Sequence, residues 1–104
     1  MEIKKELIVA IVNHGFEEDV MAAARAAGAR GGTVFNARGT ASANKEVKFL
    51  GVALHPNKEI VFILTSLEKR NDIMTAIKEK VGLATPGAGI IFSLPVESVL
   101  GVEV

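Results

Sequence analysis

The segment from Gly28 to Gly39 restricts the folds open to this 104-residue chain more than any other segment. Its glycines predict the end of a helix, a turn, a short strand over Gly32–Arg38, and a second turn that opens a small, polar loop over Gly39–Glu46. Turns of this kind expose backbone N–H groups, and Arg30 and Arg38 place a basic residue near each end of the strand. The layout therefore favours the binding of an anion or a nucleotide.

Helical spacing of apolar residues identifies two helices. The first is predicted over Phe16–Ala27, with three acidic residues in its first turn, where the helix dipole favours negative charge, and Gly28 at its end. Ser66 is expected to cap the second helix, and Gly82 lies near the end of that helix. The apolar face of the second helix is formed by Ile73, Met74, Ile77 and Val81.

Runs of apolar, β-branched residues identify the strands. Glu6–Val12 is apolar at adjacent positions, which is typical of a strand buried on both faces. Val47–Leu54 and Glu59–Thr65 flank the turn signal His55–Lys58, so we expect these two runs to form a hairpin, with Val47–Leu54 at an edge of the sheet. Gly89–Val96 is the final predicted strand.

The order β-α-β-β-α-β predicts an α+β fold of the ferredoxin-like type, with an antiparallel sheet and both helices on one face. We expect a single domain over residues 1–104. Two helices in so short a chain cover only one face of the sheet, whereas the first strand requires burial on both faces. We therefore expect an oligomer in which the bare sheet faces pack together.

Composition argues against several classes of function. The chain has no cysteine, which removes thiolate catalysis and cysteine-based metal sites. Its 12 basic and 12 acidic residues balance, so we expect no nucleic-acid partner. No segment approaches the roughly 20 apolar residues of a membrane span, and the charged start is unlike a secretory signal, so we expect a cytoplasmic, non-spanning protein. The two histidines lie in separate turns, and we predict neither catalytic nor metal-binding residues.

Several motifs resemble those of the PII signalling proteins, the nitrogen regulatory protein P-II family. The resemblance covers nearly the whole chain and rests on Gly31-Gly-Thr-Val34, on Arg38-Gly39, on Gly87-Ala-Gly-Ile-Ile-Phe92, and on the order of helices and strands. It implies a homotrimer of ferredoxin-like subunits with adenine nucleotides bound in clefts between them. It also implies a loop after the second strand, the T-loop, that contacts a partner such as a membrane transporter or a metabolic enzyme.

The resemblance implies which residues line the nucleotide cleft. In the family, the position of Thr33 supplies a hydroxyl near the adenine, that of Ile63 supplies backbone groups to it, and the turn Gly87–Gly89 surrounds the phosphates. Glycines permit this close approach of an anion to the backbone, and Arg38 is expected to guide a phosphate. The expected nucleotide-binding residues are Ile11, Gly31, Gly32, Thr33, Arg38, Gly39, Ile63, Gly87, Ala88 and Gly89.

The sequence departs from the family where cations hold the phosphates. A family lysine falls at Ile90, and two family arginines fall at Gly101 and Glu103. The lysine before the third family strand aligns with Asn57 or, after a one-residue shift, with Lys58. Loss of cations removes charge-assisted hydrogen bonds to a triphosphate, so we expect AMP or ADP rather than ATP as the effector, and no required cofactor. The chain has no tyrosine, so the tyrosine that some family members have modified has no counterpart.

Three functions agree with these observations. The first is a PII-like regulator that binds an adenine nucleotide or a related effector and thereby fixes the loop Gly39–Glu46, which alters a partner-binding surface. The second is a small oligomeric enzyme that uses the cleft between subunits. The third is a structural assembly domain in which Gly31, Gly32 and the other glycines serve only turns.

Overall fold

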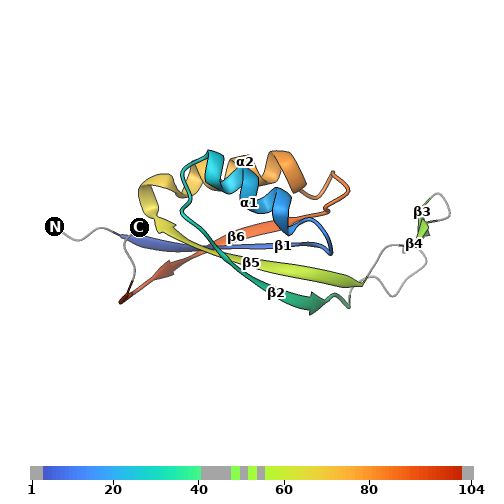
Figure 1. Ribbon diagram of the computed structural model, residues 1–104, viewed down its shortest axis with the longest axis horizontal. Helices are drawn as coiled ribbons and strands as arrows, with labels where there is room; N and C mark the ends of the chain where they lie inside the picture. Colours follow the sequence, from blue (N-terminus) through green and yellow to red (C-terminus); the bar gives the residue numbers. More distant parts are fainter. Residues whose placement is uncertain (1–3, 41–47, 50–51, 54–55, 102–104) are drawn as a thin grey trace.

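A computed structural model of the chain describes residues 4–40, 48–49, 52–53 and 56–101. Four antiparallel strands form one sheet, and two helices lie against one of its faces (Figure 1). Their chain order is the predicted β-α-β-β-α-β, so the α+β, ferredoxin-like fold is confirmed. The elements are β1 (Lys5–Asn13), α1 (Glu17–Ala26), β2 (Thr33–Arg38), β5 (Asn57–Ser66), α2 (Leu67–Val81) and β6 (Ile90–Val96).

The strands lie in the order β2-β5-β1-β6. β1 occupies an inner position and pairs along most of its length with both neighbours, so that Val9 stands opposite Phe62 of β5 and Phe92 of β6. β5 is the other inner strand, and its outer edge pairs with β2 from Asn57 to Phe62. Apolar residues at adjacent positions, as the sequence places them along β1, put apolar side chains on both faces of this inner strand.

The connection between β2 and β5 differs from the sequence prediction. Lys48–Phe49 (β3) and Val52–Ala53 (β4) pair with each other in a separate two-stranded ladder, drawn beyond the end of the main sheet in Figure 1. The prediction that Val47–Leu54 forms a hairpin with Glu59–Thr65 at the sheet edge is therefore wrong. Its physical reason is that β2 and β1 already occupy the two hydrogen-bonding edges of β5.

The two ends of this connection are tied together at its base. The Gly39 N–H donates to the Pro56 carbonyl oxygen at 2.6 Å, directly after β2 and directly before β5. The predicted loop over Gly39–Glu46 begins at this bond, and its residues 41–46 lie outside the described part of the chain. We call the segment from Thr40 to His55 the β2–β5 connection.

The sheet face under the helices holds the hydrophobic core. Alternate residues of β1 and β5 point toward α1 and α2 and are fully buried there, as the predicted helical stripe requires. Met74, which the sequence also placed on that stripe, is half-buried and packs against the core. Neither helix in the described residues is long and apolar enough to cross a membrane. Residues with no exposed surface are Ile8, Ala10, Val12, Val20, Ala24, Val61, Ile63, Ile73, Ile77 and Val81.

The predicted helix ends are largely confirmed. Gly28 follows α1 with φ of +114°, its N–H donates to Arg25, and the Ala29 N–H donates to Ala24, which together form a Schellman motif. Ser66 occupies the cap position of α2, but its hydroxyl makes no capping hydrogen bond. The first N–H of that helix is satisfied elsewhere, because Leu67 donates to the Lys4 carbonyl at 2.9 Å.

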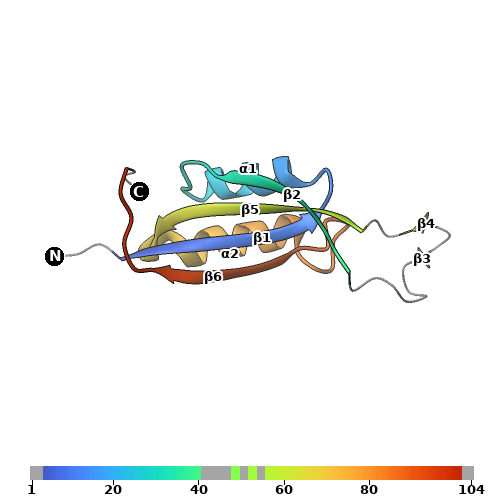
Figure 2. The same cartoon turned by 90° about the horizontal axis from the view of Figure 1, so that it is seen from below.

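The opposite face of the sheet carries no helix, and Figure 2 shows it turned toward the viewer with the helices behind. We call it the bare face. Its central side chains are apolar, and several remain well exposed, including Phe35 (43%), Phe92 (41%) and Ile90 (55%). The Phe35 and Phe62 rings pack against each other with centroids 4.8 Å apart. The strand register places on this face Leu7, Val9, Ile11, Phe35, Ile60, Phe62, Leu64, Ile90, Phe92 and Leu94.

Candidate functional site

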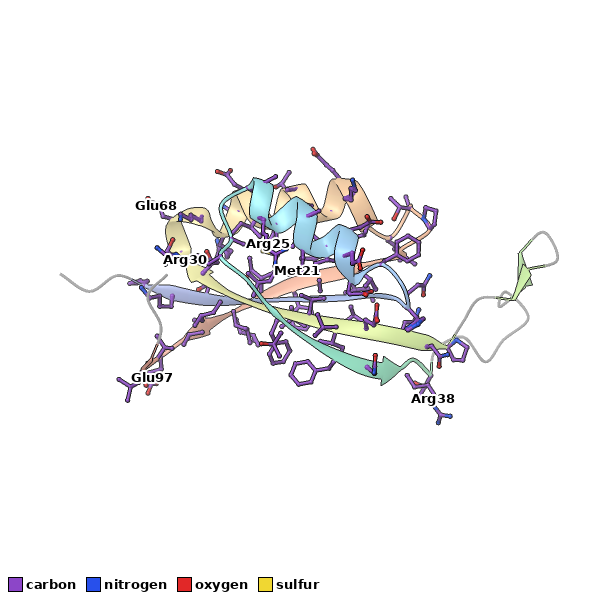
Figure 3. The ribbon with its side chains drawn as sticks, in the orientation of Figure 1. Met21, Arg25, Arg30, Arg38, Glu68 and Glu97 are labelled. Atoms are coloured by element: carbon purple, nitrogen blue, oxygen red, sulfur yellow. The ribbon has the colours of Figure 1, made fainter. Side chains whose placement is uncertain are left out.

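The residues expected to bind a nucleotide form two groups at opposite ends of β2. Gly31, Gly32 and Thr33 lie at its start, whereas Arg38 and Gly39 lie at its end, about 17 Å away at the rise of an antiparallel strand. Figure 3 shows Arg30, just before β2, and Arg38 near opposite ends of this strand. A single chain therefore does not bring the expected residues together into one cleft.

The first group packs against β5, but its two glycines differ. A methyl group added at Gly32 would lie 2.9 Å from both Met21 Sδ and the Phe62 carbonyl oxygen, so the fold itself requires a glycine there. At Gly31 the same methyl group would meet no atom within 4 Å. Packing therefore explains Gly32, whereas Gly31 is open to the close approach of a ligand.

Thr33 and Ile63 lie beside these glycines in different ways. Thr33 is exposed and stands opposite Phe62, where the ladder between β2 and β5 begins. The Ile63 side chain is fully buried in the core, so only its backbone is available to a ligand. Because β2 begins at Thr33, which is paired with Phe62, it does not cover the edge of β5 from Ile63 onward.

The second group contains the turn from Thr85 to Gly89, which follows α2. A methyl group at Gly87 would lie 2.9 Å from Val81 Cβ, so this glycine, like Gly32, has a packing reason. Each N–H of the expected phosphate turn already donates within the protein. Gly87 donates to Thr85 Oγ1 at 3.2 Å, Ala88 to the Thr85 carbonyl at 2.9 Å, and Gly89 to the Val81 carbonyl at 2.7 Å. A phosphate contact with these groups requires the turn to change its bonding.

Ile11 and Arg38 complete the second group. Ile11 is half-buried on the bare face, opposite Ile60 and Ile90. Arg38 is exposed at the last position of β2, where it is paired in register with Asn57. An exposed guanidinium at this position suits an anion that approaches from outside the chain.

Asn13, which the sequence prediction left out, and Lys58, one of the two residues aligned with a family lysine, join this end of β2 to the turn. Lys58 Nζ donates to Asn13 Oδ1 at 2.6 Å, and Asn13 Nδ2 donates to the Pro86 carbonyl at 2.9 Å. The Asn13 N–H also donates to the Gly87 carbonyl at 2.8 Å. The sequence signal was the polar Asn13 directly after an apolar strand, which we had interpreted only as the end of that strand.

A second polar cluster lies on the covered side of the sheet. Glu59 is only 5% exposed, accepts the Gly15 N–H at 3.0 Å, and lies 3.4 Å from His14 Nδ1. A hydrogen bond with the Glu59 carboxyl raises the pKa of Glu17. Burial opposes the ionisation of Glu59, but its hydrogen bonds with Glu17 and Gly15 and the nearby imidazole together lower its pKa. The ionisation of one carboxyl group is therefore coupled to that of the other.

This carboxyl pair extends the sequence prediction without replacing it. Glu17, Glu18 and Asp19 occupy the first turn of α1, as expected from the helix dipole. The involvement of Glu59 was missed, although a charged residue at a core-facing position of an apolar strand was the available signal. In the part of the chain that the structure describes, no three histidine or acidic side chains are arranged to hold a metal ion.

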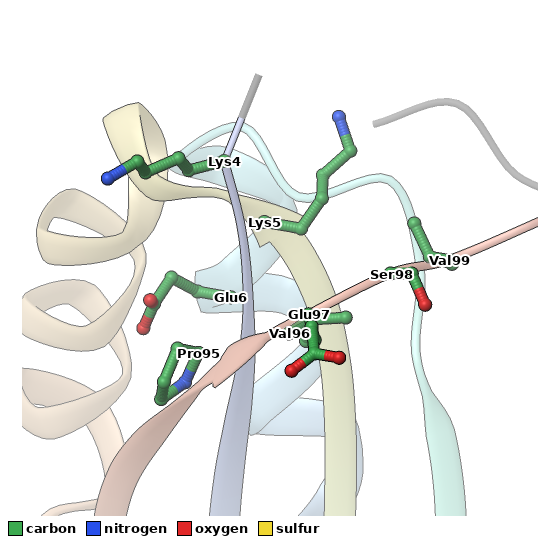
Figure 4. Close-up of a pocket in the computed structure, with 8 residues that line it drawn as sticks. All are labelled: Lys4, Lys5, Glu6, Pro95, Val96, Glu97, Ser98 and Val99. Carbon is green, nitrogen blue, oxygen red and sulfur yellow. The ribbon is translucent and has the colours of Figure 1, made fainter. Parts of the chain in front are cut away.

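Two surface hollows contain none of the expected residues. One, of about 470 Å³, lies at the start of β1 and the end of β6, at the other end of β1 from the Gly87 turn (Figure 4). Its wall includes Glu6, whose Oε1 forms an ion pair with Arg70 Nη1 at 3.2 Å. The other lies along α1, between Glu17 and Arg25. The hollow of Figure 4 is lined by Lys4, Lys5, Glu6, Pro95, Val96, Glu97, Ser98 and Val99.

Comparison with known proteins connects this geometry to a family. The model of the family described as nitrogen regulatory protein P-II matches residues 5–103. The chain belongs to the P-II family. Its structure is similar to that of Arabidopsis thaliana PII bound to citrate, with a TM-score of 0.71 and 28% sequence identity, covering 97% of this chain and 82% of that one. A comparison with curated protein sequences gave no match.

Membership of the P-II family makes the chain a small-molecule-sensing regulatory protein. The resemblance inferred from the glycine motifs is confirmed. The structural match agrees with the sheet order and with the two helices on one face.

Proposed function

We propose that three copies of this P-II family chain assemble through their bare faces and bind AMP or ADP in the clefts between them. Binding in a cleft changes the β2–β5 connection and thereby affects a partner protein. The candidates for this partner are a membrane transporter and a metabolic enzyme in the cytoplasm. Family membership supports the regulatory part of this proposal. The bare face and the separation of the two residue groups support the assembly and the place of the site.

The observation that carries the proposal is the apolar bare face. Its central residue, Val9, is only 5% exposed, whereas Phe35, Phe92, Leu94 and Ile90 around it keep 41 to 55% of their surface in contact with water. Contiguous apolar surface of this kind marks an interaction site in a soluble protein. Other copies of the same chain are the partner that is always present at matching concentration, and closed symmetric assembly buries the face without leaving an exposed copy of it.

Assembly also supplies what one chain lacks at the site. Gly31 and Thr33 lie about 17 Å from Arg38 and Gly39 along β2, which is too far for one adenine ring or one phosphate to contact both groups. A cleft formed by the start of β2 in one subunit and the end of β2 in its neighbour places the groups at the two ends of one nucleotide. In this arrangement the edge of β5 near Ile63 receives the base, and Arg38 receives the phosphates.

The charges on this chain favour a ligand with one or two phosphates. The position of the family lysine is Ile90, an apolar residue of the bare face that is 55% exposed. Gly101, at one of the family arginine positions, brings no side chain, and Glu103, at the other, lies outside the described residues. Arg38 remains as a cation for the phosphates, and the Lys58 ammonium already donates to Asn13 Oδ1. Each further phosphate therefore adds negative charge with little to neutralise it. No cofactor is required in this scheme.

A thermal-shift series with AMP, ADP, ATP and cyclic nucleotides tests the proposal, on protein whose mass in solution has been measured. A ligand at about 100 times its Kd stabilises the native protein by about 2.7 kcal/mol, so AMP or ADP should raise Tm clearly and ATP should raise it less. A trimer that responds to none of these nucleotides would contradict the proposed effector and would favour a structural assembly domain.

Matched glycine variants separate ligand contact from packing. Gly31→Val places its side chain where the fold leaves space, so it should preserve mass and Tm but remove the ADP-induced shift. Arg38→Ala should do the same by removing the exposed cation. Gly87→Val serves as the contrast, because its side chain collides with Val81 and lowers Tm even without ligand. If Gly31→Val and Arg38→Ala bind ADP as well as the unmodified protein, the site does not lie in this cleft.

A further inference from the structure

Asn13 lies between the Thr85–Gly89 turn and Lys58, and it bonds to both. Both ends of its side-chain amide are bonded, because Nδ2 donates to the Pro86 carbonyl at 2.9 Å and Oδ1 accepts from Lys58 Nζ at 2.6 Å. Its backbone N–H donates to the next carbonyl of the turn, that of Gly87, at 2.8 Å. A movement of the turn therefore acts directly on the Asn13 side chain.

Lys58 carries the contact from Asn13 to the base of the connection. Gly39 has no side chain, and a methyl group there would lie 3.0 Å from Lys58 Cε, so the lysine stem packs directly beside Gly39. The Gly39 N–H is bonded to Pro56, two residues before Lys58. Beside this contact, the His14 N–H donates to the Asn57 carbonyl at 3.1 Å, which holds the start of β5 against the end of β1.

The bonding of the turn explains why ligand binding would reach Asn13. The N–H groups of Gly87, Ala88 and Gly89 all donate to acceptors within the protein. An anion that takes one of these donors must break an internal bond of the turn and shift the adjoining peptide groups. The carbonyls of those same peptide groups, Pro86 and Gly87, are the acceptors of Asn13.

We propose that Asn13 and Lys58 are positioning residues that couple the state of the Thr85–Gly89 turn to the base of the β2–β5 connection. The inference rests on the proposed function, since it supplies the route by which an occupied cleft affects that connection. Asn13 and Lys58 are paired in register at the end of the row that continues from Val9 and Ile11, so both lie at the rim of the bare face. The coupling thus runs along the margin of the proposed contact between subunits.

Single-amide hydrogen exchange tests the coupling without any ligand. Thr85→Val removes the hydroxyl that bonds to the Gly82 carbonyl and to the Gly87 N–H, and so loosens the turn alone. Lys58→Met keeps the stem beside Gly39 and removes the ammonium that bonds to Asn13. The exchange rate of the Gly39 N–H is measured in the unmodified protein, in each variant and in the double variant.

In the unmodified background, Thr85→Val should raise the exchange rate of the Gly39 N–H by at least about fivefold. In the Lys58→Met background, the same substitution should raise this rate by less than about twofold. A purely structural role for Lys58 predicts equal factors in both backgrounds, and that result would overturn the proposal. So would a Gly39 rate that does not respond to Thr85→Val at all. Lys69→Met is the matched control, because it removes a lysine ammonium that bonds to Gly28 on another part of the surface.

Asn13→Asp tests the other link. The aspartate keeps an acceptor for Lys58 but presents an oxygen instead of an N–H to the Pro86 carbonyl, so it should uncouple the turn from Gly39 as Lys58→Met does. If Gly39 exchange in this background still responds to Thr85→Val as it does in the unmodified protein, Asn13 does not transmit the change.

Measurements with ADP test this inference separately from the proposed function. If ADP raises Tm, it should alter Gly39 exchange in the unmodified protein but not in Lys58→Met, whose Tm shift with ADP should persist. Loss of that Tm shift would make Lys58 a ligand contact and overturn its positioning role. Absence of any ADP shift in the unmodified protein would count against the proposed effector, and the ligand-free exchange cycle would then decide the coupling by itself.

Discussion

The two faces of the sheet are built from the same strands but are buried to very different extents. On the covered face, Ile8 and Ile63 have no exposed surface, because α1 and α2 lie over them. On the bare face, Phe92 keeps 41% and Leu94 keeps 48% of its surface exposed, although both are as apolar as the core residues. A strand that alternates polar and apolar residues needs cover on one side only, and β1 does not alternate in this way.

The difference shows which part of the fold one chain completes alone. The helices finish the covered face within the chain, whereas the bare face stays exposed in a single chain and is the surface that the proposed assembly buries. Substitutions on the covered face should therefore affect unfolding of the subunit, and substitutions on the bare face should affect assembly.

Ile8→Ala should have the largest effect on subunit stability. The cavity left at a fully buried position costs about 2–5 kcal/mol of the free energy of unfolding. Urea unfolding measures this loss, and the mass of the native protein should not change. An Ile8→Ala protein that unfolds normally but dissociates would remove the distinction between the two faces.

Gly32→Ala extends the comparison to the start of β2 and should have the next largest effect. The added methyl group meets Met21 and the Phe62 carbonyl, and such overpacking costs about 1–3 kcal/mol. Gly31→Ala, with no atom near its methyl group, should change stability by less than about 0.5 kcal/mol and is the control. Equal losses in the two variants would mean that packing does not distinguish these glycines.

Phe92→Ser should weaken the proposed assembly by about 1–2 kcal/mol per subunit, since it removes apolar area that a single chain leaves exposed. Mass measured by light scattering over a dilution series should show dissociation at a higher protein concentration than for the unmodified protein. Circular dichroism should still show the folded sheet. If dissociation is unchanged while the subunit loses stability, the bare face is not the contact between subunits.

Glu17→Gln should have the smallest effect and tests the covered face near its edge. The hydrogen bond with Glu59 raises the pKa of Glu17 above its ordinary value of 4.5, so the folded state holds this proton more tightly than the unfolded state. That contribution to stability is complete below the unfolded pKa and is lost as pH rises through the folded pKa. Glutamine keeps a donor for Glu59 without titrating.

Urea unfolding at a series of pH values from about 5 to about 8 measures the difference. The unmodified protein should lose stability relative to Glu17→Gln as pH rises across this range. Glu59, whose pKa is lowered, acts in the opposite direction, and its contribution is lost as pH falls. Parallel pH profiles for the two proteins would show that Glu59 does not raise the pKa of Glu17.

Much of the fold was predictable from the sequence because it depends on local signals. Gly28 ends α1 where its left-handed φ was expected, and the apolar rows of β1 and α2 identified both the core and the uncovered face. The edge pairing of Val47–Leu54 was predicted wrongly. Apolar character alone does not specify a strand's partner, and here β2 takes the edge of β5 that the hairpin required.

The candidate site was less predictable because its key contacts join residues distant in the sequence. Asn13 meets Lys58 and Pro86 only after β1, β5 and the turn following α2 come together. Likewise, Glu59 of β5 forms a hydrogen bond with Glu17 of α1, and the two residues lie far apart in the sequence. The spacing of glycines marked both ends of β2 but did not reveal that Gly32 and Gly87 have packing roles and Gly31 does not.

Native mass spectrometry with and without ADP tests the central claim most directly, namely that copies of this chain cover each other's bare faces and form nucleotide clefts between them. The account predicts a species of three times the 11.0 kDa chain mass that takes up as many as three ADP molecules. Phe92→Ser should reduce the abundance of that species and the bound ADP together. A monomer that binds ADP by itself would contradict the account, because the cleft would then be complete within one chain.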